Sequence, residues 1–390
     1  MKTTHSRRRG AGFSLVELMV SIVIGLLALV FATRMVSNAE VNKQAAVGTS
    51  DSMQNGMLGL FSIEKDLSQA GWGLNDRLIN GCDTVFHDDR GYALLGTTRN
   101  GVAVTPLTAA LIQSNGADPD VIAIYSGSAM SNTGMLRVSS ALGSGSGTID
   151  VDRNPYGFNS TDDVAAGGDV ILVAPDDRAS AKCALAQVSH ADAPATPGGQ
   201  NKIVIGSGGA NRYNAGSIGV QFKSLEARVF NLGPASQLSF HTWSLDRGFL
   251  RLRATNLAGA SAAPATVIDN VVSLKAQYGL DRSASFTAGQ SPTVTEWSNT
   301  VGDADNDGAE KPDDYERVAA IRVAVVARSR TPEKPNGSGV CSATSTLPTV
   351  FGGAISVNVA VAGDTVDWKC YRYRSFETIV PIRNSAWRPT

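Results

Sequence analysis

One carboxylate, Glu17, lies inside a long apolar stretch near the N-terminus. From Phe13 to Thr33 it is the only ionisable side chain, and Arg34 ends the stretch. A helix of about 21 residues rises ~1.5 Å per residue and so matches the ~30 Å hydrocarbon core of a bilayer. A charged side chain within a span costs about 2.5 kcal/mol or more at the bilayer centre, so such residues usually mark a function and have a partner. We therefore expect Glu17 to require a cation.

Ordinary targeting segments explain this stretch less well. A secretory signal has a shorter apolar core followed by small residues, whereas here Gly10, Ala11 and Gly12 precede the core. A twin-arginine signal fits poorly because the arginines run directly into these small residues. A plain signal anchor with its Glu near the interface is the remaining alternative. The basic residues of the leader predict that this end stays in the cytoplasm and that the rest of the chain is exported.

A second group of carboxylates has the spacing of a metal site. Asp303, Asp305 and Asp307 precede a glycine at relative positions 1, 3 and 5, and Asp314 occupies position 12. Alternate carboxylates can converge on Ca²⁺ because the glycine lets the chain turn sharply, as in an EF-hand loop. Asp replaces the usual Glu at position 12, and Pro312 interrupts the segment. Calcium is the one cofactor this sequence predicts, and a solvated acidic turn is the alternative.

The cysteines predict disulfides rather than a metal site. All four lie beyond the apolar stretch, at Cys82, Cys183, Cys341 and Cys370. An even number in an oxidising compartment favours two disulfides, for which three pairings are possible. Proximity in the sequence favours Cys341–Cys370 and leaves Cys82–Cys183, and buried free thiols are the alternative. No C-x-x-C pair indicates a zinc ribbon or a thioredoxin-type site.

Nothing in the sequence indicates an enzyme. G-x-S-x-G and Walker A motifs are missing, so any force for assembly must come from another protein. His87, His190 and His241 are isolated in the sequence, which is more typical of surface or packed histidines than of ligands. The mildly acidic composition gives no broad electrostatic reason to bind nucleic acid.

A long helix must position the apolar stretch. No proline occurs from Phe13 to Gly71, and Gly71 can adopt the left-handed conformation that ends a helix. A helix from Phe13 to Ala70 would be about 87 Å long. Its second half is expected to pack on a sheet through a stripe of Met53, Met57, Leu60, Phe61 and Leu67. Four glycines should each weaken the helix by about 1 kcal/mol relative to Ala: Gly25, Gly48, Gly56 and Gly59.

Beyond Gly71 the pattern becomes β. Short runs rich in β-branched residues alternate with turn-forming residues. The expected strands are Val121–Tyr125, Asp169–Val173, Lys202–Ile205, one or two within Ile218–Leu232, a hairpin of Phe240–Ser244 with Phe249–Arg253, Val318–Ala327, and Cys370–Ile382. Low-complexity patches at 139–147, 191–209, 256–264 and 331–348 are expected to be surface loops.

The junction Gly12-Phe13-Ser14-Leu15-Val16-Glu17 resembles a type III signal, the prepilin leader of type IV pilins and type II secretion pseudopilins. The resemblance implies cleavage after Gly12 by a prepilin peptidase and N-methylation of Phe13. Glu17 would then be the fifth mature residue. The freed α-amino group of a neighbouring subunit would supply its cation without placing a second charged side chain in lipid.

Segments at both ends of the chain resemble the PilW family of minor pilins. Ile63–Trp72 is similar to that family's helix exit, D-L-x-x-A-G-aromatic, and Val267–Asp281 is similar to its V-x-x-L-x-x-x-Y-G-x-D segment. Val318–Val323 and Arg374–Asn384 resemble the strands that follow. The resemblance does not extend to residues 84–266.

Membership implies an α+β, type IV pilin-like fold in which a long N-terminal helix packs on an enlarged antiparallel β-sheet head. The parts would be a leader peptide (1–12), a membrane-spanning and polymerising part of the helix (13–33), an amphipathic part (34–71) and an exported head (72–390). The implied role is a minor pilin that helps initiate pilus assembly at the tip. The implied partners are other minor pilins, the major pilin, a tip adhesin, the prepilin peptidase, the inner-membrane assembly platform and the bilayer. The subunit would lie in the bacterial inner membrane with its head in the periplasm, and on the cell surface after assembly.

Two other functions stay open at this point. A type II secretion pseudopilin of the J kind would share the same N-terminal region, and neighbouring genes would discriminate it from a minor pilin. A membrane-anchored surface hydrolase or binding protein belongs to another class, and a processed N-terminus would argue against it.

Overall fold

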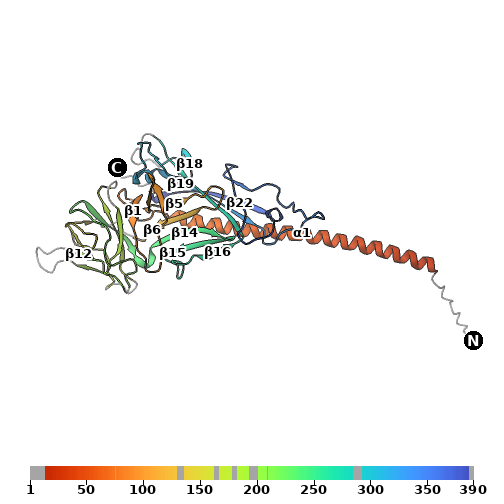
Figure 1. Cartoon of the computed structure of the whole chain (residues 1–390). Helices are drawn as coiled ribbons and strands as arrows, with labels where there is room; N and C mark the ends of the chain where they lie inside the picture. Colours follow the sequence, from red (N-terminus) through yellow and green to blue (C-terminus); the bar gives the residue numbers. More distant parts are fainter. Residues whose placement is uncertain are drawn as a thin grey trace, which may run out of the picture.

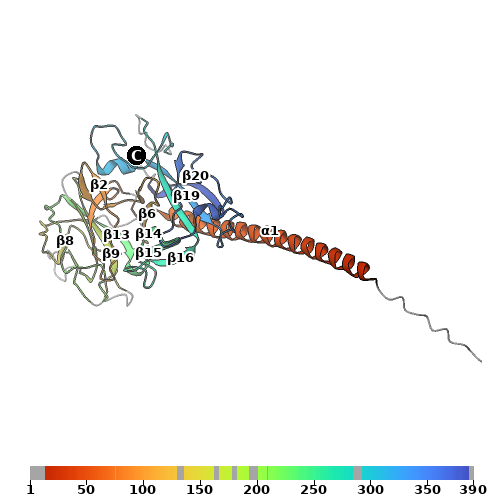
Figure 2. The same ribbon diagram turned by 45° about the vertical axis from the view of Figure 1, so that its right-hand side comes forward.

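The chain folds into a long helix that carries a β-rich head at one end (Figure 1). This computed structural model describes residues 14–74, 76–129, 136–161, 167–177, 182–192, 201–208, 210–283 and 292–385. Helix α1 (Leu15–Gln69) extends away from the head along its first half and lies against the head along its second half (Figures 1 and 2). The architecture is therefore α+β, with an apolar N-terminal helix followed by a sheet-rich head.

Helix α1 begins and ends within two residues of the expected positions. The amide of Leu18 donates to the carbonyl of Ser14 over 3.1 Å, which closes the first turn. The helix ends at Gln69, and Gly71 follows with φ +78°, a conformation that glycine adopts readily. Near the C-terminus, the side-chain amide of Asn384 donates to the carbonyl of Ala70 over 3.0 Å. The end of the helix is thus held by a residue from the far end of the sequence.

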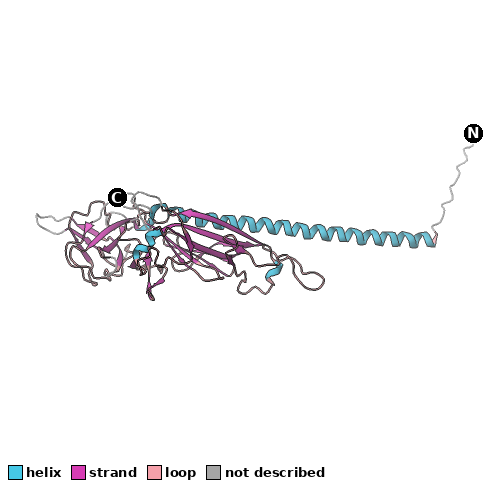
Figure 3. Ribbon diagram, turned by 90° about the horizontal axis from the view of Figure 1, so that it is seen from above, coloured by secondary structure: helices cyan, strands magenta, loops and turns pink. Residues whose placement is uncertain are grey.

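The helix packs mainly on the last sheet of the chain. This sheet has the order β18-β17-β19-β22, and all its pairings are antiparallel. Its strands are β17 (Val271–Leu280), β18 (Glu296–Ser298), β19 (Val318–Arg328) and β22 (Tyr373–Pro381). Helix α1 contacts β19 and β22 most extensively. Figure 3 shows strands lying along the second half of the helix. The segments that resemble the PilW family therefore lie together around one helix–sheet unit.

The face of α1 that packs on this sheet differs from the predicted stripe. Where burial is described, the buried positions are Gly48, Ser52, Gly56, Gly59, Ile63 and Leu67, with Ala70 just past the helix end, and they recur every three or four residues. Met53, Met57 and Phe61 are instead 44%, 57% and 62% exposed. The prediction was right for Leu67, which is buried, and wrong for these three, because the middle of the buried face meets the sheet through small residues that allow close contact. A Cβ on Gly56 would lie 2.2 Å from Cε2 of Phe376 on β22.

A five-stranded sheet flanks this unit, in the order β16-β15-β14-β6-β5. Its strands are β5 (Ala110–Gln113), β6 (Val121–Ser126), β14 (Ser239–Asp246), β15 (Phe249–Ala254) and β16 (Ala265–Asp269). The expected hairpin is β14–β15, which turns at Arg247 (φ 49°) and Gly248 (φ 78°). Lys275 of β17 and Asp120 form a buried ion pair that joins the segment before β6 to the helix-bearing sheet.

The part of the head farthest from the helix N-terminus contains a six-stranded sheet, β4-β1-β10-β9-β13-β7, and a three-stranded sheet, β11-β12-β8. The strands of the first are β1 (Cys82–Val85), β4 (Pro106–Leu107), β7 (Leu136–Arg137), β9 (Asp169–Pro175), β10 (Cys183–Gln187) and β13 (Ala227–Pro234). Those of the second are β8 (Thr148–Val151), β11 (His190–Asp192) and β12 (Asn201–Val204).

Two-stranded ladders complete the described strands: β2 (Thr97–Arg99) with β3 (Val102–Val104), and β20 (Thr349–Val350) with β21 (Ile355–Ser356). Four 3-10 helices complete the elements: η1 (Ala235–Gln237), η2 (Pro312–Arg317), η3 (Trp368–Cys370) and η4 (Arg383–Ser385).

The head departs from the sequence-based expectations in three places. It is not wholly antiparallel, because β1 pairs in parallel with β10. The expected loop at 191–209 contains β12 and most of β11. The expected loop at 139–147 is not fully on the surface, since Leu142 is buried and forms a bridge with Phe222. Pattern alone missed these because the strands are short and their burial depends on distant partners.

Two disulfides join residues that are far apart in the sequence. Cys82 bonds to Cys183, and Cys341 bonds to Cys370, which is the pairing that proximity favoured. The first crosses between the parallel strands β1 and β10, and the second anchors the loop that follows β19. All four cysteines are used in these two bonds.

Candidate assembly site

The first turns of α1 place Glu17 on an exposed apolar surface. Glu17 lies in the first turn of the helix, where a carboxylate is stabilised by the positive end of the helix dipole. The backbone carbonyl of Glu17 accepts a hydrogen bond from the hydroxyl of Ser21 over 2.7 Å. Within the residues that the structure describes, no cationic group pairs with its carboxylate.

The helix around Glu17 is long and apolar enough to cross a membrane. Among the described residues, one segment meets this test, Leu15–Ser37, with a mean hydropathy of 2.7 and no part of it buried by the head. Its apolar side chains point outward on all sides, as in a helix whose natural surroundings are lipid or other apolar helices. A membrane anchor is consistent with this segment.

Gly12 and Phe13, the residues of the expected cleavage and methylation, lie outside the described residues. Ser14 is the first residue described and forms the N-cap of α1 in an extended conformation. The processing site is therefore supported by sequence and not by geometry.

The second half of α1 is joined to the head by polar contacts as well as by packing. Asn55 donates to the carboxylate of Asp269 on β16 over 2.9 Å. Asp66 accepts hydrogen bonds from Nδ1 of His241 over 2.7 Å and from Nε1 of Trp243 over 2.8 Å. These contacts fix the rotation of the helix about its axis, and thus the direction in which the Met53–Phe61 face points.

His241 was expected to be an isolated histidine, and the structure gives it a partner 175 residues away. Burial lowers the pKa of His241, but its hydrogen bond to Asp66, the negative charge of Asp66 and a hydrogen bond to Asn256 raise it above its usual value of 6.5. Sequence alone offered no signal for this pair, because the two residues share neither a motif nor a period.

The hydroxyl of Ser239 lies 3.1 Å from Nε2 of His241, so Ser239, His241 and Asp66 have the residue types of a hydrolase triad. Nε2 also lies 2.8 Å from the side-chain oxygen of Asn256, which can only accept a hydrogen bond. A protonated ring donates to Asp66 and Asn256 and has no lone pair for the serine. The arrangement supports a structural contact rather than a general base.

The aspartate segment before η2 brings together three of its four predicted ligands. Carboxylate oxygens of Asp303, Asp305 and Asp307 all lie within 4.8 Å of one another. Asp314 is not part of this group. It is buried, and its carboxylate accepts from the amides of Ala304 (2.6 Å), Asp305 (3.2 Å) and Lys311 (2.6 Å). The residues present can offer three carboxylates to a cation, while Asp314 shapes the loop.

The charge balance of this loop is modified by Lys311. Its ammonium group pairs with Asp307 and lowers the pKa of that carboxylate. Burial raises the pKa of Asp314, although three backbone amides act against the shift. A cation bound at the three aspartates would compete with Lys311 for Asp307.

Comparison with protein families identifies the C-terminal part of the head. Residues 244–384 match the family described as Type IV Pilus-assembly protein W, PilW. This part of the chain is therefore similar to PilW domains. The matched segment begins in β14 and contains the sheet on which α1 packs and the Cys341–Cys370 disulfide. Residues 7–33 match the prokaryotic N-terminal methylation motif. Residues 34–243 lie outside both matches.

Other comparisons add little to the PilW assignment. No curated protein matches the chain. A solved structure, type IV-like pilin TTHA1219 from Thermus thermophilus, shares 16% identity over 38% of this chain, with a TM-score of 0.19. This chain covers 66% of that pilin, slightly less than two thirds of its length. The PilW domain and the methylation motif together support a pilin-like protein with a membrane-anchored N-terminal helix.

Proposed function

We propose that this protein is a minor pilin of a type IV pilus that is processed between Gly12 and Phe13 and helps initiate pilus assembly. The observation that carries the proposal is Glu17, a carboxylate on an exposed apolar helix and inside the methylation motif, for which the described residues supply no cation. A carboxylate in such surroundings is stabilised when another subunit supplies a cation. The new α-amino group that cleavage before Phe13 creates has this charge and belongs at this depth.

The exposed face of α1 beside the head supports assembly with other subunits. Met53, Met57 and Phe61 form an apolar row that the chain's own head leaves exposed. An apolar row of this kind next to a span is typical of a surface that another protein covers. Contact with neighbouring pilin subunits would bury it.

The size of the head supports a position at the pilus tip. The head contains a five-stranded, a six-stranded and a three-stranded sheet in addition to the sheet on which α1 packs. Repeated stacking of such a head along a shaft would be sterically demanding, whereas a tip leaves it room on one side. A tip position with other minor pilins and an adhesin fits this shape. A structural rather than enzymatic role is consistent with the contacts of His241 to Asp66 and Asn256.

The decisive experiment replaces Glu17 by Val. The variant should be processed normally, because the cleavage site is unchanged, and should insert in the membrane at least as well. Its recovery in sheared pili should fall about tenfold or more, since a buried ion pair that loses one partner is strongly destabilised. Glu64→Val is the matched control, because Glu64 is an exposed carboxylate on the same helix outside the span.

Mass spectrometry of the mature N-terminus tests processing separately. We expect a chain that begins with methylated Phe13, and we expect substitution of Gly12 to leave an unshifted precursor band. A mature chain that begins downstream of residue 33 would remove the apolar helix and refute the proposal. Normal recovery of Glu17→Val in pili would refute the assembly role of the carboxylate.

A further inference from the structure

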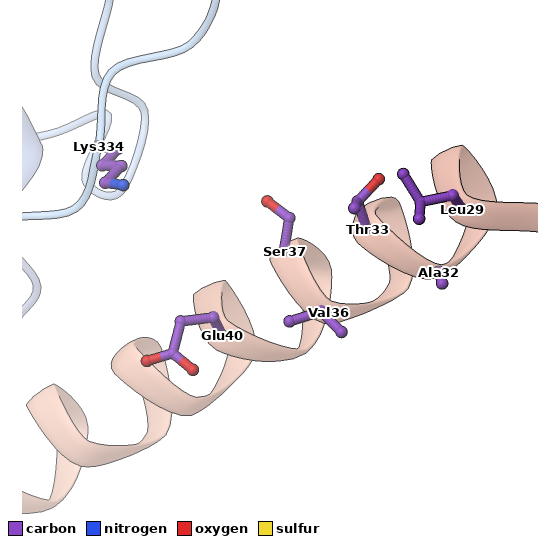
Figure 4. Close-up of a pocket in the computed structure, with 7 residues that line it drawn as sticks. All are labelled: Leu29, Ala32, Thr33, Val36, Ser37, Glu40 and Lys334. Atoms are coloured by element: carbon purple, nitrogen blue, oxygen red, sulfur yellow. The ribbon is translucent and has the colours of Figure 1, made fainter. Parts of the chain in front are cut away.

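A pocket of about 540 Å³ lies between α1 and the loop that follows β19. The helix contributes residues from Leu29 to Glu40, and the loop contributes Lys334 (Figure 4). Lys334 faces the helix across this space, opposite the stretch that carries Ser37 and Glu40. The pocket therefore joins two segments that are about 300 residues apart in the sequence.

The position of the membrane-spanning segment sets the level at which this pocket lies relative to the bilayer. The apolar segment ends at Ser37, and the pocket includes Thr33 and Ser37 from its last two turns. The loop leaves the sheet at Ser329, whose Cβ lies 3.0 Å from the position of a Cβ on Gly48. From the level of Gly48 to that of Thr33 the helix rises about 22 Å. When the helix spans a bilayer, Lys334 therefore lies at the level of the lipid headgroups on the head's side.

One side of the pocket is apolar and suits acyl chains. Leu29, Ala32 and Val36 line it, and all three are exposed on the helix surface. Ser37 and Glu40 lie nearer the headgroup level, at the end of the pocket toward the head. This change from apolar to polar along the helix matches the change from acyl chain to headgroup in a phospholipid.

The other side of the pocket carries one positive and one negative group. Lys334 and Glu40 are exposed, and within the described residues neither forms an ion pair. Glu333, the acidic neighbour of Lys334, is paired with Arg372 and does not neutralise the lysine. A ligand that satisfies both groups must carry an anion and a cation close together.

We propose that this pocket binds a zwitterionic phospholipid with a primary ammonium headgroup, of the phosphatidylethanolamine class. Lys334 pairs with the phosphate, and Glu40 accepts hydrogen bonds from the ammonium group. The acyl chains lie against the apolar flank of α1. A choline headgroup lacks N–H donors for Glu40, and a glycerol headgroup leaves Glu40 without a cation. This inference rests on the membrane-stored state that the proposed function assumes.

Native mass spectrometry of the full-length protein, released from nanodiscs with equal amounts of phosphatidylethanolamine, phosphatidylcholine and phosphatidylglycerol, tests the proposal. The wild type should retain phosphatidylethanolamine in preference to the other two lipids. Lys334→Gln and Glu40→Gln should each reduce that preference about fivefold, as expected for the loss of one headgroup charge contact. Lys223→Gln is the control, because the Lys223 side chain is 83% exposed in another part of the head.

A photo-crosslinkable phosphatidylethanolamine gives a second readout that does not depend on variants. It should label the peptide that contains Lys334. Equal retention of the three lipids, retention unchanged in both variants, or the absence of label on this peptide would overturn the proposal. A protein–protein crosslink at Lys334 in place of a lipid adduct would show that a second helix occupies the pocket, and it would overturn the proposal too.

The assay separates this proposal from the assembly role. Lipid retention is measured on purified protein, so a variant that fails to enter pili can still retain the lipid. Conversely, normal entry into pili with no lipid preference removes only the lipid site. Intact disulfides and an unchanged melting temperature will show that each variant is folded.

Discussion

The contact between Gly56 of α1 and Phe376 of β22 sets how closely the helix approaches the sheet. Intrinsic helix propensity predicts that Gly56→Ala stabilises the protein by about 1 kcal/mol. The structure predicts the opposite sign. The new Cβ would lie 2.2 Å from Cε2 and 2.4 Å from Cδ2 of Phe376, and 3.3 Å from Cβ of Ala327. Real Cβ atoms do not approach other atoms so closely, so the ring or the helix must move.

The magnitude follows from two opposing terms. Overpacking of a well-packed contact costs about 1–3 kcal/mol. Phe376 is half-buried, so its ring can yield only in part. After the gain in helix propensity of about 1 kcal/mol is subtracted, we expect Gly56→Ala to lower the free energy of unfolding by up to about 2 kcal/mol.

Chemical denaturation of the full-length chain in detergent, followed by tryptophan fluorescence, measures this change. Trp243 is a suitable reporter because it is buried and hydrogen-bonded to Asp66 of the helix. Gly25→Ala is the matched control, since a Cβ there meets nothing within 4 Å and should cause no loss. In a Phe376→Leu background, Gly56→Ala should become neutral or stabilising, with a coupling energy of about 1 kcal/mol or more.

Two results would refute this reasoning. The first is a rise in the free energy of unfolding for Gly56→Ala, which would mean that helix propensity outweighs the contact. The second is an equal loss in the wild-type and Phe376→Leu backgrounds, which would mean that the loss does not arise from this ring.

Two further predictions concern charged groups of the head. Because Asp66 raises the pKa of His241 above 6.5, the stability from this pair is fully present below pH 6.5 and is lost as the pH rises through the raised pKa. Unfolding at several pH values should therefore show wild-type stability falling from pH 6 to 8.5 and a flatter or inverted slope in Asp66→Asn; identical slopes would contradict this. If Asp303, Asp305 and Asp307 bind calcium, a chelator should lower the melting temperature of the wild type and leave that of Asp305→Asn unchanged. An unchanged wild-type transition, together with no calcium binding in calorimetry, would remove the site.

The features that were predicted well from the sequence depend on local signals. The helix from Leu15 to Gln69 follows from an unbroken run without proline and a glycine at its end. The hairpin of β14 and β15 follows from two alternating runs around a short turn. Each of these signals lies within a few residues of the structure that it specifies, so no distant partner is needed to read it.

Local signals in the sequence did not predict which face of the helix is buried. Hydrophobic periodicity assigns large apolar residues to the interior, and it selected Met53, Met57 and Phe61. The structure instead buries Gly56 and Gly59, because the closeness of helix and sheet depends on the side chains that the sheet presents. The small residues that seemed to weaken the helix are the ones that permit the contact.

The sequence by itself determined the apolar helix, the position of Glu17 within it and the signals of a PilW-type pilin, since these depend on composition and spacing along one segment. Only the tertiary structure decided which face of the helix is covered, that Asp66 meets His241, that Asp314 binds backbone amides instead of joining the other aspartates, and that Lys334 lies beside the end of the span. Each of these depends on the approach of residues far apart in the chain. That approach is fixed by the packing of the whole head and leaves no local pattern in the sequence.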